Sequence, residues 1–372
     1  MKLDVPGEPT VAQLRAIVAR KDAAKIRTVN ACGSVLRARG MEILAELPNV
    51  VELDVQMAKL DDKAMRAIAR MATLERLDIR QNVVGLGVKG LRAIFTLPNV
   101  RDFACSDGLA RGGLDALLAS DFATRLAGLN VFMADLTDRH GIAIAKAKSL
   151  ANLERLELSV NRLTGKTLAA IAASKTLARI VELSFGHMHV RDEVERLAKW
   201  AALPRLRRLG LRSTGAPSKS LAKLAKATSL VELDLSANGY GDADAEAIAA
   251  AFPTVRKLNL DWNRFEPAAG ALLAKRTGLE SLILSDPIAP GGLSDDGAIA
   301  IAESRAMASL RHLDLRQNAI HDDGAMALAK SPYLEKLESF DLRWNHIGKA
   351  GVRALGKRFG KRVNLFAQRD CE

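Results

Sequence analysis

Aromatic residues and cysteines are both scarce in this sequence. Phe, Trp and Tyr make up 4% of the 372 residues, so the core must consist mainly of Leu, Ile, Val and Ala. The three cysteines, Cys32, Cys105 and Cys371, lie far apart and do not have the spacing of a metal site. These features argue against a disulfide-stabilised extracellular domain and indicate a reducing, cytosolic setting.

Long apolar runs and an N-terminal targeting signal are also missing. No apolar run approaches the ~18 residues that a membrane-spanning helix needs, and the first fourteen residues contain no apolar core of a signal peptide. We therefore expect a cytoplasmic protein that makes no contact with a membrane. The formal net charge of +12 would suit an acidic partner such as nucleic acid only if the charge collected on one surface.

An eleven-residue phrase recurs along the chain. It reads LRHLDLRQNAI at 310–320 and LVELDLSANGY at 230–240, with apolar residues at its first, fourth, sixth and eleventh positions and often Asn at the ninth. Successive copies begin 24 to 27 residues apart, except for one step of 31 residues. The thirteen copies begin at Ile26, Val50, Leu74, Val100, Leu126, Leu153, Ile180, Leu206, Leu230, Val255, Leu279, Leu310 and Leu337.

A repeat of this length is the mark of a solenoid. Apolar residues at the fourth and sixth positions predict a short strand with its leucines turned inward. The segment GAMALAK at 324–330 has the apolar spacing of a short helix. Stacked copies bury a continuous core that one copy could not form. Strands repeat every ~4.8 Å and helices every ~10 Å, so the stack must bend with its strands on the concave side.

The segments 313–334 and 340–359 carry the pattern L-x-L-x-x-N-x-I-x-x-x-G before an Ala/Leu-rich helix. This pattern resembles the leucine-rich repeat family and, more narrowly, bacterial members of its ribonuclease-inhibitor-like subgroup. The resemblance implies an α/β horseshoe of about 13 repeats, with parallel concave strands and short convex helices. It also implies a non-enzymatic scaffold that binds a protein partner. Because the subgroup includes GTPase-activating proteins, regulation of a small GTPase is an alternative.

The repeat also divides the chain. We expect residues 1–25 to form an N-terminal capping helix, in which Thr10 and Gln13 make a capping box. The solenoid should span 26–362, and 363–372 should form a C-terminal strand and tail. We expect the protein to be a monomer.

Several short motifs resemble ligand-binding or catalytic motifs but have simpler structural explanations. GLGVKG (85–90) and LTGKT (163–167) look like phosphate-binding loops, yet the register of the repeat accounts for their glycines. His187 and His189 have no third ligand placed by the sequence, and Cys371 is most simply a tail residue. Since no nucleophile–base–acid set stands out, we expect no catalysis, no cofactor and no metal.

Charged residues are unevenly placed along the phrase. Its third, fifth and seventh positions, which should face the concave side, hold eleven acidic and eight basic residues. The excess of Lys and Arg must therefore lie on helices and edges, for example in 219–227 and 348–362. Solvated helix faces explain these segments most simply. Nucleic-acid or acidic-protein contact through the basic convex and C-terminal surface is an alternative, although we do not expect a nucleic-acid partner.

Large side chains at exposed strand positions point to the partner site, because Trp and Arg are over-represented at binding hot spots. Two tryptophans occupy the eighth position of their copies. We predict that the C-terminal half of the concave face binds the partner through Trp262, Trp344, Arg316, Arg343, Asp261, Asp314 and Asp341. Phe132 and Met133 form a second candidate group. The alternative is that each Trp only packs on the stems of neighbouring side chains.

Overall fold

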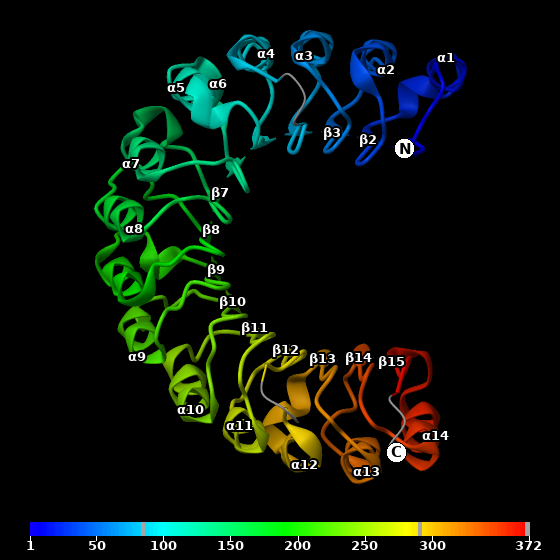
Figure 1. The fold of residues 1–372 in the computed structure, drawn as a ribbon, viewed down its shortest axis with the longest axis vertical. Helices are drawn as coiled ribbons and strands as arrows, with labels where there is room; N and C mark the ends of the chain where they lie inside the picture. Colours follow the sequence, from blue (N-terminus) through cyan, green and yellow to red (C-terminus); the bar gives the residue numbers. More distant parts are fainter. Residues whose placement is uncertain (83–85, 289–291, 369–372) are drawn as a thin grey trace. The chain divides into compact units, whose positions relative to one another are not determined.

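The computed structural model describes residues 1–82, 86–288 and 292–368. The chain forms two compact units, Met1–Ser184 with Trp200–Ala202 and Phe185–Lys199 with Leu203–Glu372. Within each unit, short parallel strands follow one another in chain order and helices cover one side of the sheet (Figure 1). We call the strand surface that faces away from the helices the inner face, and the helix surface that faces away from the strands the outer face.

The described part of the first unit contains eight strands and eight α-helices. Its strands are β1 (Lys2–Asp4), β2 (Thr28–Asn30), β3 (Glu52–Asp54), β4 (Arg76–Asp78), β5 (Asp102–Ala104), β6 (Gly128–Asn130), β7 (Arg155–Glu157) and β8 (Glu182–Ser184). Its helices are α1 (Val11–Val18), α2 (Arg37–Leu44), α3 (Asp62–Ile68), α4 (Val88–Ile94), α5 (Leu114–Leu118), α6 (Asp121–Arg125), α7 (Asp138–Lys146) and α8 (Gly165–Ala172).

The second unit, as far as the structure describes it, contains seven strands and six α-helices. Its strands are β9 (Arg208–Gly210), β10 (Glu232–Asp234), β11 (Lys257–Asn259), β12 (Ser281–Ile283), β13 (His312–Asp314), β14 (Ser339–Asp341) and β15 (Val363–Asn364). Its helices are α9 (Ser218–Leu221), α10 (Asp242–Ala251), α11 (Pro267–Leu273), α12 (Ser294–Glu303), α13 (Asp322–Lys330) and α14 (Lys349–Phe359).

The phrase places its apolar residues as predicted. Leu313 and Leu315 are 2% and 0% exposed, so both turn into the layer between strands and helices. In the parallel register, Leu313 lies between Leu282 of β12 and Phe340 of β14. Each strand is too short to bury an apolar face alone, so the core forms only when neighbouring repeats stack.

The asparagines at the ninth position hydrogen-bond the turns of adjacent repeats. Asn263 Oδ1 accepts hydrogen bonds from the backbone N–H groups of Asn238 (3.0 Å) and Tyr240 (3.1 Å). Its Nδ2 donates to the carbonyl groups of Leu235 (3.2 Å) and Leu260 (2.8 Å). One buried side chain therefore satisfies backbone groups in two repeats, groups that would be costly to leave unpaired.

A second set of contacts links the helices, and the sequence analysis missed it. An Asp at the start of one helix accepts hydrogen bonds from backbone N–H groups at the start of the next. Asp322 Oδ1 accepts from Gly351 (2.9 Å), and Asp295 Oδ1 accepts from His321 (2.8 Å) and Gly324 (2.9 Å). The glycines leave room for the carboxylate, since a Cβ on Gly351 would lie 2.6 Å from Asp322 Oδ1.

The two ends of the chain add strands to the thirteen predicted copies. Besides the predicted helix α1, residues 1–25 contain strand β1, which pairs with β2. Thr10 and Gln13 form the expected capping box. At the other end, strand β15 pairs with β14, and Gln368 takes the place of the ninth-position asparagine, since its Nε2 donates to Leu342 O at 2.9 Å.

Two predicted features lie partly outside the described residues. The insertion between the copies at Leu279 and Leu310 includes residues 289–291, and the C-terminal tail includes residues 369–372 with Cys371. Among the residues that are described, no helix combines the length and apolar character needed to cross a membrane.

The helix-to-helix contacts can be tested with Gly351→Ala. Alanine is the better helix former, but its Cβ would be forced against Asp322, so we expect a loss of about 1–3 kcal/mol in the free energy of unfolding. The matched control is Gly356→Ala in the same helix, where a Cβ would meet nothing within 4 Å. The control should gain about 0.5–1 kcal/mol. Denaturant unfolding measures both, and a gain in both variants would contradict the proposed close packing.

Candidate functional site

The eighth position of the phrase has an unusual backbone conformation. In twelve of the thirteen copies this residue has a positive φ, between 48° and 73°. The backbone N–H of this residue still hydrogen-bonds the next repeat. For example, the N–H of Trp262 donates to Ser285 O at 3.2 Å. The left-handed region costs a non-glycine residue roughly 1–2 kcal/mol, so Gly or Asn would be the least strained choice here.

The chain nevertheless places large apolar side chains at several of these positions. Trp262 (φ 55°) and Trp344 (φ 57°) occupy them in the second unit, and Met133 (φ 55°) and Val160 (φ 58°) in the first. Trp262 is 50% exposed on the inner face, whereas Trp344 is half-buried. These residues neither build the core nor suit a left-handed backbone, which makes them candidates for a binding surface.

The arginines at the seventh position are held by aspartates two residues earlier on the same strand. Arg343 Nε lies 3.0 Å from both carboxylate oxygens of Asp341, and its guanidinium carbon lies 5.0 Å from the centre of the Trp344 ring. Arg316 Nε lies 2.9 Å from both oxygens of Asp314. These fork-like pairs fix each guanidinium on the inner face before any partner arrives.

The structure therefore brings together most of the predicted C-terminal group. Arg316, Arg343 and Trp344 lie on neighbouring strand ends with Asp314 and Asp341. Trp262 follows β11, which is three strands away from β14 in the sheet. Trp262 therefore lies about 14 Å along the sheet from Trp344, which follows β14. Asp261 bonds instead to Ser285 (2.8 Å) and lies 4.0 Å from Arg212.

Phe366 belongs to the same surface, and the sequence analysis missed it. Asp341 is in register with Asn364, and continuing that register by two residues places Phe366 beside Arg343. The Phe366 side chain is 72% exposed. The sequence signal was present, since the fragment RVNLFAQ at 362–368 puts Phe366 at the seventh position of a further strand.

Two carboxyl groups on this face are partly desolvated. Burial raises the pKa of Asp261, and the charge of Asp286 raises it further, against the hydrogen bond from Ser285. Burial also raises the pKa of Asp286, whose nearest cation is Arg316 at 3.6 Å. Burial therefore makes the charged form of both carboxyl groups less stable than it would be in water.

The second predicted group lies in the first unit. Phe132 is half-buried and Met133 is 51% exposed, both just after strand β6. The backbone N–H of Met133 donates to Ser159 O at 3.1 Å. These two residues therefore form an inner-face apolar patch within that unit.

The phosphate-like motifs are structural where they are described. Gly87 N–H donates to Asp62 Oδ1 at 2.8 Å, while Gly85 of GLGVKG lies outside the described residues. In LTGKT, Asp138 Oδ1 accepts from Thr164 N–H at 2.8 Å and from the Thr167 hydroxyl at 2.7 Å. A carboxylate thus occupies the place that a phosphate would need.

The histidine pair gains no partner for metal binding. His187 and His189 are both exposed. Within the described ranges, no group of three or more His, Cys, Asp or Glu residues is arranged to hold a metal ion.

Comparison with known proteins agrees with this architecture. A family model described as "Leucine Rich repeat" matches residues 226–249, 306–329 and 333–356. The fold is a leucine-rich repeat solenoid. No curated protein sequence matches the chain.

Two solved structures have the same leucine-rich repeat fold. An internalin (InlF) from Listeria monocytogenes has a TM-score of 0.51 and 17% identity, with 95% of this chain and 94% of that chain covered. A chain of the Rad7–Elc1 complex in yeast has a TM-score of 0.57 and 16% identity, with 97% and 86% covered. At these identities the likeness concerns the fold.

The backbone strain at the eighth position can be tested with Val160→Asn. Asn tolerates the left-handed region better than a β-branched residue, so we expect a gain of about 1 kcal/mol in the free energy of unfolding. Val51→Asn is the control, because Val51 is also half-buried but has no positive φ. The control should lose stability, since Asn is a poor strand residue. Denaturant titration measures both, and a loss at Val160 as large as at Val51 would rule out strain.

The desolvated carboxyl predicts a pH-dependent effect of Asp261→Asn. A folded pKa above the unfolded value of 3.8 means that the charged carboxyl lowers stability once both states are ionised. We expect Asp261→Asn to melt at a higher temperature than wild type at pH 7. The difference should shrink as the pH falls through the raised pKa towards 3.8. Asp314→Asn, which weakens the fork to Arg316, should instead melt lower at pH 7. A lower melting temperature for Asp261→Asn at pH 7 would show that its ion pairs outweigh its burial.

Proposed function

We propose that this protein is a non-enzymatic scaffold that binds a protein partner on the inner face of its second unit. The contact is centred on Trp344 and Phe366, with Arg343 and Arg316 beside them and Trp262 further along the sheet. The observation that carries the proposal is the placement of Trp262, which is 50% exposed, and of the half-buried Trp344 at left-handed backbone positions. Strained residues that add nothing to the core are typical of functional surfaces.

The arginines support the same proposal. Each guanidinium is pre-oriented by an Asp on its own strand, so little side-chain entropy is lost when a partner contacts it. Arg343 also stacks on Trp344, and Trp and Arg together are the residues most enriched at binding hot spots. A protein surface, with apolar and polar groups side by side, suits this mixture of side chains.

The location, the oligomeric state, the subgroup and a role in GTPase regulation are proposed from the sequence and not from the geometry of the inner face. The cytoplasmic location, the monomeric state and the bacterial, ribonuclease-inhibitor-like subgroup belong to the proposal on the basis of the sequence. Regulation of a small GTPase depends on the family resemblance alone. The scaffold is therefore the function that the geometry supports best.

The proposal predicts that Trp262→Ala with Trp344→Ala weakens the partner without unfolding the protein. Loss of a hot-spot aromatic typically costs ~2 kcal/mol or more, which is about thirty-fold in affinity. Wild type and variant are compared on a partner recovered by pull-down from the native host, with a binding titration beside a melting curve.

The control is Phe132→Ala with Met133→Ala, which removes the apolar patch of the first unit. It should leave affinity within about two-fold. Unchanged affinity for the tryptophan variant, with a loss in the control, would move the contact to the first unit. A collapsed melting curve for the tryptophan variant would show that these two side chains stabilise the fold instead.

A further inference from the structure

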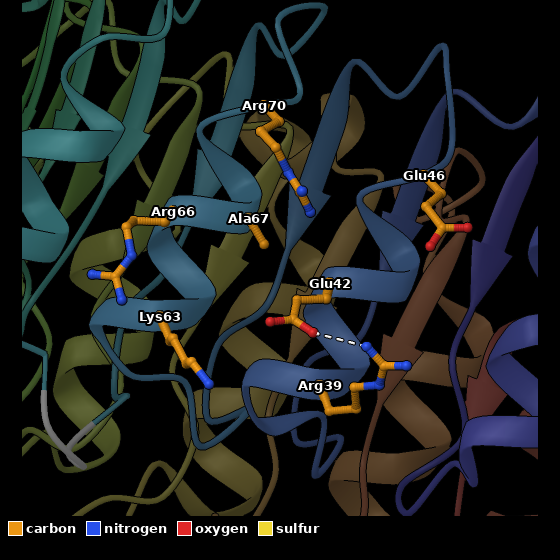
Figure 2. Close-up of a pocket in the computed structure, with 7 residues that line it drawn as sticks. All are labelled: Arg39, Glu42, Glu46, Lys63, Arg66, Ala67 and Arg70. Carbon is orange, nitrogen blue, oxygen red and sulfur yellow. Dashed lines mark hydrogen bonds and ion pairs between the residues drawn. The ribbon is translucent and has the colours of Figure 1, made fainter.

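The outer face of the first unit carries a groove that the proposed function does not use. It lies between helices α2 and α3 and has a volume of about 480 Å³ (Figure 2). The α2 side contributes Arg39, Glu42 and Glu46, and the α3 side contributes Lys63, Arg66 and Arg70.

The acidic residues of this groove are already occupied. Glu42 pairs with Arg39 at 3.1 Å, as Figure 2 shows. Glu46 pairs with Arg15 of α1 at 2.6 Å. Both carboxylates are therefore engaged by cations of α1 and α2.

The α3 wall is left as a row of unpaired cations. Lys63, Arg66 and Arg70 are exposed, and none of them forms an ion pair with any described residue. Lys63 and Arg66 lie one turn apart on α3, and Arg70 lies in the turn that follows this helix. On the next helix, exposed Lys89 and Arg92 extend the positive surface.

The groove offers little besides this charge. None of the described residues that line it is aromatic, so it has no platform on which a base could stack. Its walls are largely the short helices α2 and α3, which offer no strand edge for the main chain of a bound peptide. Ala67 is the small apolar residue between the charged rows. Such a site suits a small ligand that carries several negative charges close together.

We propose that this groove binds a compact oligophosphate anion, with Arg66 and Arg70 gripping the phosphate groups and Lys63 adding a point charge at the end of the row. Guanidinium forks match the oxygens of a phosphate, and a chain of two or three phosphates fits the length of the row. The site lies wholly in the first unit and is independent of the inner-face partner.

The test is calorimetric titration of the full chain with tripolyphosphate at 150 mM salt. Wild type should show one saturable site. Arg66→Gln with Arg70→Gln should weaken binding at least ten-fold. Arg353→Gln with Lys357→Gln removes the same charge from exposed positions on α14 and should change affinity less than two-fold. Absence of saturable binding to wild type, or equal losses in the two variants, would overturn the proposal.

Two further measurements separate a specific site from general attraction. Glu46→Gln removes a negative charge from the groove and should tighten tripolyphosphate binding about two-fold, an effect opposite in sign to that of the arginine variant. A hexaglutamate peptide and an oligothymidylate should bind at least ten-fold more weakly than tripolyphosphate. A different result would be that the peptide or the oligonucleotide binds as tightly as tripolyphosphate, or more tightly, and loses that binding in the Arg66/Arg70 variant. This result would overturn the assigned ligand class in favour of that polymer. Melting curves should coincide for wild type and the arginine and lysine variants, because every substituted cation is exposed, whereas Glu46→Gln, which breaks the exposed pair with Arg15, should shift the melting temperature only slightly.

Discussion

Hydrogen bonding of the turn backbone by the next repeat is the constraint on which the rest of the structure depends. Each strand is two or three residues long, so the turn that follows exposes N–H and C=O groups that no strand pairing can satisfy. The amide of Asn263, and of its equivalents, supplies both a donor and an acceptor to these groups. Because the partner groups lie partly in the preceding repeat, no repeat is complete without its neighbour.

The same constraint shapes the inner face. The eighth residue takes a left-handed conformation in nearly every copy, directly before the side chain that enters the turn. The side chain at that position therefore points away from the core. Since it has no part in the hydrogen bonding of the turn, the chain can place Trp262 or Trp344 there at the cost of backbone strain. Structural and interaction residues are thus separated within a single phrase.

The two surfaces handle charge in different ways. On the inner face, Arg316 and Arg343 are each held by an aspartate of their own strand. On the outer face, acidic residues at helix starts such as Asp62 and Asp322 bond to the backbone of the next helix. These carboxylates bond to backbone groups and form no direct ion pair with Lys63, Arg66 or Arg70 of α3 and the turn after it. The two surfaces therefore differ, because Arg316 and Arg343 on the inner face are each paired with a carboxylate.

The features that repeat could be predicted from the sequence alone. Periodic leucines predicted the buried pair Leu313 and Leu315, and the position of Trp262 in the phrase predicted its exposure. These follow from local alternation, which needs only short-range sterics and burial. The structure alone decided the rest. The contact of Asp322 with Gly351, the strand β1, the position of Phe366 beside Arg343 and the groove between α2 and α3 each join residues from different repeats. Their geometry depends on how the repeats stack and on which side-chain partners are already taken, and a pattern within one repeat does not contain that information.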